Sequence, residues 1–145
     1  MTTGQYPRSP KEQVGGLCHL GRAIDKVRLR HAGKIQDYNY LTVGFDKYLL
    51  DKLEIEGADF EKRVLQGGMD AEIADWVKSN GKILSEEEKA EWNNMVLTFG
   101  PKNEQAQKAF DSYKAEIAKK PGMSADKLSK LTTWFQLIEH DEGRM

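Results

Sequence analysis

The feature that most constrains this 145-residue chain is a series of short apolar stripes at helical spacing, each ended by glycine or proline. Residues three and four apart share one face of a helix, so these stripes predict amphipathic helices. We expect a basic N-terminal helical part over residues 9–33, short helices over 46–81 and longer helices over 85–139. Only the short run 40–43 suggests a strand. The sequence therefore predicts an all-α fold, a single compact domain over 1–145 of about seven short-to-medium helices.

Several helix ends can be placed from capping residues. Ser9 with Glu12 has the pattern of a capping box, which predicts a helix start. Ser85 with Glu88 predicts a second capping box further along the chain. The last helix is expected to begin at Ser124 and to run unbroken to the end of the helical part.

Composition excludes several classes of protein. Hydrophobic residues make up 39% and charged residues 31% of the chain, which is typical of a folded, non-membrane domain. An apolar run of about 20 residues, as a membrane span requires, is absent from the sequence. The N-terminal residues lack an apolar signal core, and Cys18 is the only cysteine. We therefore expect a cytoplasmic protein with no membrane partner.

Charge is unevenly distributed along the chain. Residues 1–34 contain seven Lys and Arg against two acidic residues, a charge of +5, and the remainder must carry −6 because the whole chain carries −1. A nearly neutral total gives no support to sequence-independent nucleic-acid binding. The uneven distribution favours an anionic ligand, or an acidic protein segment, as the partner of the basic end.

The concentration of basic charge lies within the segment 15–33. On a helix, His19, Arg22, Lys26 and Arg30 form one line, opposite an apolar stripe that includes Leu20, Ile24 and Val27. His31 falls on the apolar stripe and is expected to be a partly buried core histidine. Like charges at this spacing repel one another unless an anion neutralises them, and arginine offers a planar fork for phosphate or carboxylate.

The sequence thus predicts a binding or interaction module that holds an anionic small molecule or an acidic partner segment. The candidate ligand-binding residues are Arg8, His19, Arg22, Asp25, Lys26, Arg28, Tyr38 and Tyr40. Two alternatives stay open. In the first alternative, the chain is an enzyme that uses His19 with Asp25 or Asp141 as acid or base and Arg22 as charge stabiliser. In the other alternative it binds no ligand, and the basic face pairs with the acidic C-terminal residues Glu139, Asp141 and Glu142.

Metal and cofactor chemistry is not indicated by the sequence. His19 and His31 are twelve residues apart, or about 18 Å along one helix, and cannot share an ion. Cys18 and His19 are neighbours, and adjacent helical side chains do not face each other, so a nucleophile–base pair is not favoured. We therefore expect no metal and no cofactor.

Several blocks of the chain resemble a known family. They are Tyr6-Pro7-Arg8-Ser9-Pro10, the segment from Leu17 to Arg28, the segment from Asp46 to Leu53, the helix around Asp70, Glu72 and Trp76, and the pair Trp134-Phe135 with Asp141 to Arg144. Together they resemble the bacterial domain-of-unknown-function family numbered 5069. The resemblance implies one self-contained cytosolic domain. Its pattern includes polar residues at both chain ends, which implies either a binding site or a buried ion-pair network that joins those ends.

Overall fold

The computed structural model describes residues 6–33, 40–41, 44–120 and 125–142. Over these residues it contains eight α-helices and one two-stranded sheet, which confirms the predicted all-α class. The chain divides into two compact units, Met1–Val96 and Leu97–Met145, and each is described by itself.

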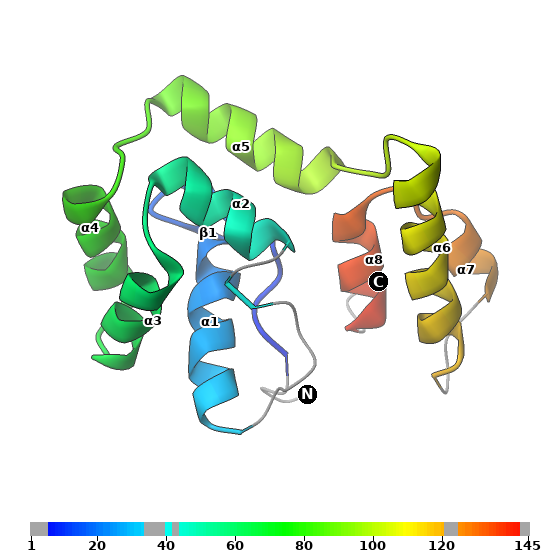
Figure 1. Ribbon diagram of the computed structural model, residues 1–145, viewed down its shortest axis with the longest axis horizontal. Helices are drawn as coiled ribbons and strands as arrows, with labels where there is room; N and C mark the ends of the chain where they lie inside the picture. Colours follow the sequence, from blue (N-terminus) through cyan, green and yellow to red (C-terminus); the bar gives the residue numbers. More distant parts are fainter. Residues whose placement is uncertain (1–5, 34–39, 42–43, 121–124, 143–145) are drawn as a thin grey trace. The chain divides into compact units, whose positions relative to one another are not determined.

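The first unit contains the sheet and most of the helices (Figure 1). Its elements are β1 (Gln13–Val14), β2 (Leu17–Cys18), α1 (Leu20–His31), α2 (Gly44–Leu53), α3 (Gly57–Leu65), α4 (Asp70–Asn80) and nearly all of α5 (Glu86–Thr98). The second unit contains α6 (Glu104–Ala118), α7 (Ala125–Ser129) and α8 (Trp134–Asp141). None of the helices in the described part of the chain combines the length and apolar character that crossing a bilayer requires.

The small sheet is a hairpin that the sequence analysis did not predict. β1 and β2 are antiparallel, and the two residues between them, Gly15 and Gly16, have φ angles of 61° and 81°. Two consecutive residues in the left-handed region are what a tight hairpin turn requires, and glycine adopts that region without steric cost. The expectation that no strand would form near residues 9–33 was therefore wrong.

The predicted helix start at Ser9 was also wrong. The Ser9 carbonyl accepts from the Glu12 amide at 3.1 Å, which closes one isolated turn, and the Ser9 hydroxyl accepts from the Lys11 amide. The chain then enters the hairpin, so the helix begins only at Leu20. A capping pattern without a following helical run produced a turn here.

The core of the first unit lies between α1 and the helices that pack on it. α1 buries Leu20, Ile24 and Val27, as the apolar stripe predicts, and contacts α3, which buries Phe60 and Val64. At α5, the predicted capping box is confirmed by two reciprocal hydrogen bonds between Ser85 and Glu88.

The second unit has its own apolar cluster. Phe110 and Ile117 of α6 pack with Leu128, Leu131 and Leu137. The expected unbroken last helix was wrong, because two helices, α7 and α8, occupy the described part of that range. Thr133 and Gln136 form a capping box that starts a new helix at Trp134.

Candidate functional site

The backbone of His19 is the first unusual feature of the basic segment. His19 precedes α1 with φ 72° and ψ −21°, in the left-handed region, and its side chain is 1% exposed. A non-glycine residue in this region is strained, and such strain persists only where surrounding contacts fix the residue. The His19 amide donates to the Pro10 carbonyl at 2.8 Å, which is one of those contacts.

Asp46 provides the other contacts and is the centre of a buried polar cluster. Its side chain is fully buried near the start of α2. One carboxylate oxygen lies 2.5 Å from His19 Nε2 and 3.2 Å from Lys26 Nζ. The other accepts from the Leu41 amide at 3.0 Å. One carboxylate therefore joins α1, α2 and the residue at position 41.

These contacts set the protonation states of the cluster. Burial alone would raise the pKa of Asp46, but the hydrogen bond from His19 and the charge of Lys26 hold that pKa well below its usual value. Burial also lowers the pKa of His19 to about 4, against the opposing effect of Asp46. The imidazole is therefore neutral near pH 7. Because a carboxylate only accepts, the hydrogen lies on Nε2, and Nδ1 is an acceptor.

Nδ1 of His19 is an exceptional atom of the cluster, as is Nε of Arg22. It is buried and has no hydrogen-bond partner among the residues that the structure describes. Buried polar atoms are nearly always satisfied, and each exception requires an explanation.

Arg22 and Lys26 lie on the buried side of α1, so the predicted basic line does not form an exposed face. Arg22 is 2% exposed, and its Nη1 donates to the Arg8 carbonyl at 3.0 Å. Both cations contribute to lowering the pKa of His19, because their charges oppose a second proton on the ring. Asp46, Arg22, Lys26 and His19 are hereafter the Asp46 cluster.

Arg8 and Asp25 form a separate ion-pair network. Arg8 makes paired hydrogen bonds to Asp25, at 2.9 and 3.1 Å, and to Asp70, at 2.6 and 3.1 Å. The hydrogen bond to Asp70 contributes most to raising the pKa of Arg8, although burial opposes it. The enzyme alternative expected His19 to act with Asp25 or Asp141. In the structure Asp25 pairs with Arg8 and not with His19. The carboxylate beside His19 is Asp46.

The remaining candidates lie toward the end of α1. Arg28 Nη2 donates to the Gly68 carbonyl at 2.9 Å. The Tyr40 hydroxyl donates to Glu61 at 2.5 Å, and the Arg30 guanidinium lies 4.5 Å from the centre of the Tyr40 ring. His31 is exposed rather than part of the core, which corrects the prediction. Tyr38 lies outside the described residues.

The structure thus brings together three predicted residues, His19, Arg22 and Lys26, and adds Asp46. The sequence analysis assigned the segment from Asp46 to Leu53 to a helix, and it gave Asp46 no role in a site. The available signal was an aspartate preceding a leucine-rich helix, which is also typical of an ordinary helix cap. Its pairing with His19 is tertiary and has no local sequence pattern.

The geometry also bears on nucleophilic catalysis by Cys18 and on metal binding. Cys18 is 1% exposed, and burial raises its pKa, so the thiol stays protonated and is a poor nucleophile. Over the described ranges, no group of three or more His, Cys, Asp or Glu side chains is arranged to hold a metal ion.

The fold and the cluster together define a small helical domain with a buried histidine–aspartate pair beside two cations. The chain belongs to the family described as "Domain of unknown function (DUF5069)", which matches residues 4–144. This match confirms the resemblance inferred from the sequence blocks. Among curated proteins, no significantly similar relative was found.

Proposed function

We propose that this chain is a binding module that holds a small organic anion, one that also carries a hydroxyl group, at the Asp46 cluster. The observation that carries the proposal is the buried, neutral His19, whose Nδ1 is an acceptor without a partner among the described residues. A ligand hydroxyl would satisfy that atom by donating to it. A cytoplasmic location, expected from the lone Cys18, belongs to the same proposal.

The start of α1 favours an anion at this place. His19 gives the helix no side-chain capping bond, and the first turn of α1 contains no acidic residue. The first amides of a helix lack partners within the helix, and the helix dipole places positive charge there, so anions are stabilised at this end. Arg22 and Lys26 follow on the same buried side of α1, and their charges add to this field.

Access to Nδ1 depends on the side chains around His19. The Phe45 ring packs edge-on against the imidazole, with ring centres 5.5 Å apart, and Phe45 is only partly buried. We propose that a ligand enters by displacing Phe45, because this partly exposed ring contacts the buried imidazole.

The experiment compares two dicarboxylates that differ only in one hydroxyl group. Binding of malate and of succinate is measured by thermal shift and by the ¹⁵N chemical shift of His19 Nδ1. Malate should bind about tenfold more tightly, which is the value of one additional hydrogen bond. Equal binding of both anions, or no change at Nδ1, would contradict the proposal.

Variants separate the contributions of charge and of the acceptor. Lys26→Met should weaken both ligands, whereas His19→Asn should remove only the preference for malate. Asparagine tolerates the left-handed backbone of residue 19, so this variant limits the structural disturbance. Lys47→Met, an exposed lysine paired with Asp51, is the matched control and should leave both affinities unchanged.

An enzyme remains the second candidate, because one observation favours it. The short hydrogen bond from His19 Nε2 to Asp46 orients the ring as a carboxylate orients a catalytic histidine, and Nδ1 could then accept a proton from a substrate. Arg22 would stabilise developing negative charge. Chemical change of a hydroxylated anion, lost in His19→Asn, would favour this function over simple binding.

The other expected partners are proposals of the same kind. An acidic segment of another protein would supply carboxylates without a hydroxyl group. If such a segment is the partner, malate and succinate should bind equally well. Pairing of the basic face with Glu139, Asp141 and Glu142 stays a prediction. Within the second unit, Asp141 accepts a hydrogen bond from Lys120.

A further inference from the structure

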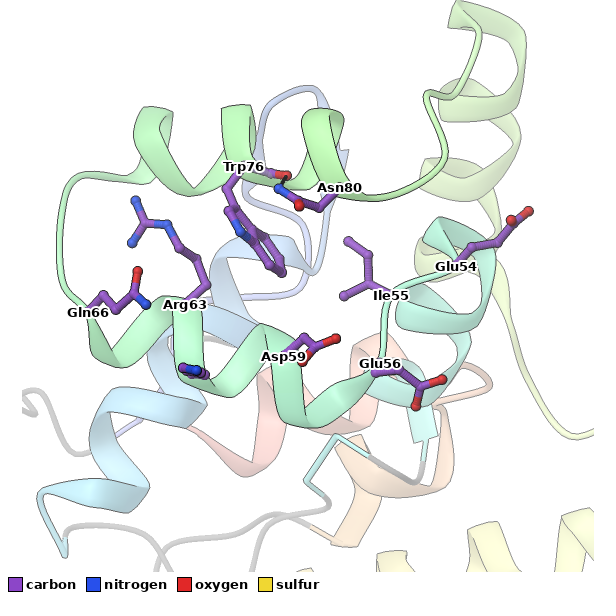
Figure 2. Close-up of a pocket in the computed structure, with 9 residues that line it drawn as sticks. Glu54, Ile55, Glu56, Asp59, Arg63, Gln66, Trp76 and Asn80 are labelled. Carbon is purple, nitrogen blue, oxygen red and sulfur yellow. Dashed lines mark hydrogen bonds between the residues drawn. The ribbon is translucent and has the colours of Figure 1, made fainter.

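A second candidate site lies on the first unit, in a groove between α3 and α4. The groove has a volume of about 290 Å³ and is lined by residues of both helices and of the link before α3. Figure 2 shows the Trp76 ring projecting from α4 into the groove, toward α3. This volume is just below the range for small-molecule sites, about 300–1,000 Å³, and suits a small ligand.

One wall of the groove is firmly fixed. The Lys82 amide donates to the Leu53 carbonyl at 2.6 Å, which ties the end of α4 to the link that contains Ile55. A Cβ atom at Gly81 would lie 2.5 Å from that carbonyl oxygen and 2.7 Å from the Ile55 side chain. The close approach requires glycine at position 81, and it holds the end of α4 against the link that contains Ile55.

The two ends of the groove carry opposite charge. Asp59 lies toward one end, with Glu54 and Glu56 beyond it and their carboxylates directed away from the Trp76 ring (Figure 2). Arg63 lies on the opposite side of that ring, and Lys62 of α3 also lines the groove. Within the described residues, none of the three carboxylates forms an ion pair. The Arg63 guanidinium donates through Nη1 to the Gly67 carbonyl at 2.8 Å, which holds it in place and uses one of its five N–H donors.

This layout restricts the class of ligand. A simple anion would meet Asp59, and a simple cation would meet Arg63 and Lys62, so neither kind of ligand is matched to the whole groove. A short peptide with free termini has an ammonium and a carboxylate separated by an apolar body. Trp76 and Ile55 provide an apolar surface between the charged ends.

We propose that the groove binds a short zwitterionic peptide, of two or three residues. Its ammonium lies toward Asp59, at the end that also carries Glu54 and Glu56. Its carboxylate pairs with Arg63, and an apolar side chain packs on Trp76. A guanidinium can bind a terminal carboxylate through two parallel hydrogen bonds, and the face of a partly buried tryptophan also attracts a nearby ammonium. This site shares no residue with the Asp46 cluster.

The test uses dileucine in three forms, with free termini, with an acetylated N-terminus and with an amidated C-terminus. The readout is the indole N–H resonance of Trp76, with Trp92 and Trp134 as internal references. The free peptide should shift the Trp76 signal saturably, and blocking either terminus should weaken binding about tenfold. Equal binding of all three forms, or no shift at about 10 mM peptide, would overturn the proposal.

Variants that remove one charge from the groove test which end binds the peptide ammonium and which end binds its carboxylate. Arg63→Gln should reduce the penalty for amidation, with Lys62 as the remaining cation of the groove, while the acetylated form stays weaker than the free peptide. Asp59→Asn should reduce the penalty for acetylation and leave the penalty for amidation. Lys78→Gln, an exposed change on α4 outside the groove, is the control and should preserve both preferences. Unchanged preferences in both groove variants would contradict the proposed orientation.

Discussion

The two ends of α1 carry similar side chains in opposite environments. Toward its start, His19, Arg22 and Lys26 are buried, whereas Arg30 and His31 near its end are exposed. The same residue types therefore form a buried polar cluster at one end and a solvated ion-pair group at the other. The difference arises from elements distant in sequence, because Asp46 meets the first end and Glu61 of α3 meets the second.

The comparison predicts that removing the carboxylate at each end has very different effects. Asp46→Ala should destabilise the protein by about 3–5 kcal/mol, because it leaves a buried lysine without its carboxylate. Glu61→Ala, at the exposed end, should cost less than about 1 kcal/mol. Urea unfolding of both variants measures the two values, and similar losses would remove the distinction between the ends.

The second prediction concerns the pH dependence of stability. The pKa of His19 is about 4 in the folded protein, below its usual 6.5, so the unfolded chain binds more protons between these values. Stability should therefore fall as pH decreases from 6.5 to 4, by up to about 3 kcal/mol. Urea unfolding at several pH values measures the slope.

The control for this slope is His19→Gln, which cannot titrate. Its stability should be nearly constant between pH 6.5 and 4.5, since the lowered pKa values of Glu61, Asp70 and Glu88 act at lower pH. His31, at the exposed end of α1, provides the matched comparison. His31→Gln should leave the pH dependence of stability intact. Loss of that dependence in this variant would show that His31, and not His19, causes it.

A smaller effect is expected at the Arg8 network. Arg8→Lys retains the charge but cannot reach both Asp25 and Asp70 with paired hydrogen bonds. Because these side chains are 25–40% exposed, solvent screening limits the loss to about 1 kcal/mol. Thermal unfolding at low and high salt tests this, and the difference from the natural protein should shrink as salt rises.

The smallest effect is expected at the exposed end of α1. Tyr40→Phe removes the hydroxyl that donates to Glu61 and should cost about 0.5–1 kcal/mol. The Arg30 guanidinium can still stack on the phenylalanine ring. A loss as large as that of Asp46→Ala, measured by the same urea unfolding, would show that this end is not the weaker one.

The sequence was sufficient for the helical class because apolar spacing is a local property. The stripe of Leu20, Ile24 and Val27 predicted the buried face of α1, and Ser85 with Glu88 predicted a true helix start. Local patterns were misleading at Ser9, where the chain turned into a hairpin at Gly15 and Gly16. A capping pattern has predictive value only when a helical run follows it.

The candidate site was only partly predictable. His19, Arg22 and Lys26 were selected from their common helical line, but the line was expected to face an external anion. Its burial depends on Asp46, which is 27 residues from His19 and meets it only in the folded chain. The groove over Trp76 was not predicted either, because its lining comes from three segments that share no sequence pattern.

The most direct test of the account is the protonation state of His19, measured by the ¹⁵N chemical shifts of its ring as pH is varied. We predict a neutral ring at pH 7 with the hydrogen on Nε2, a midpoint near pH 4, and a change at Nδ1 when malate is added. A ring that is doubly protonated at pH 7, or that carries its hydrogen on Nδ1, would contradict the account.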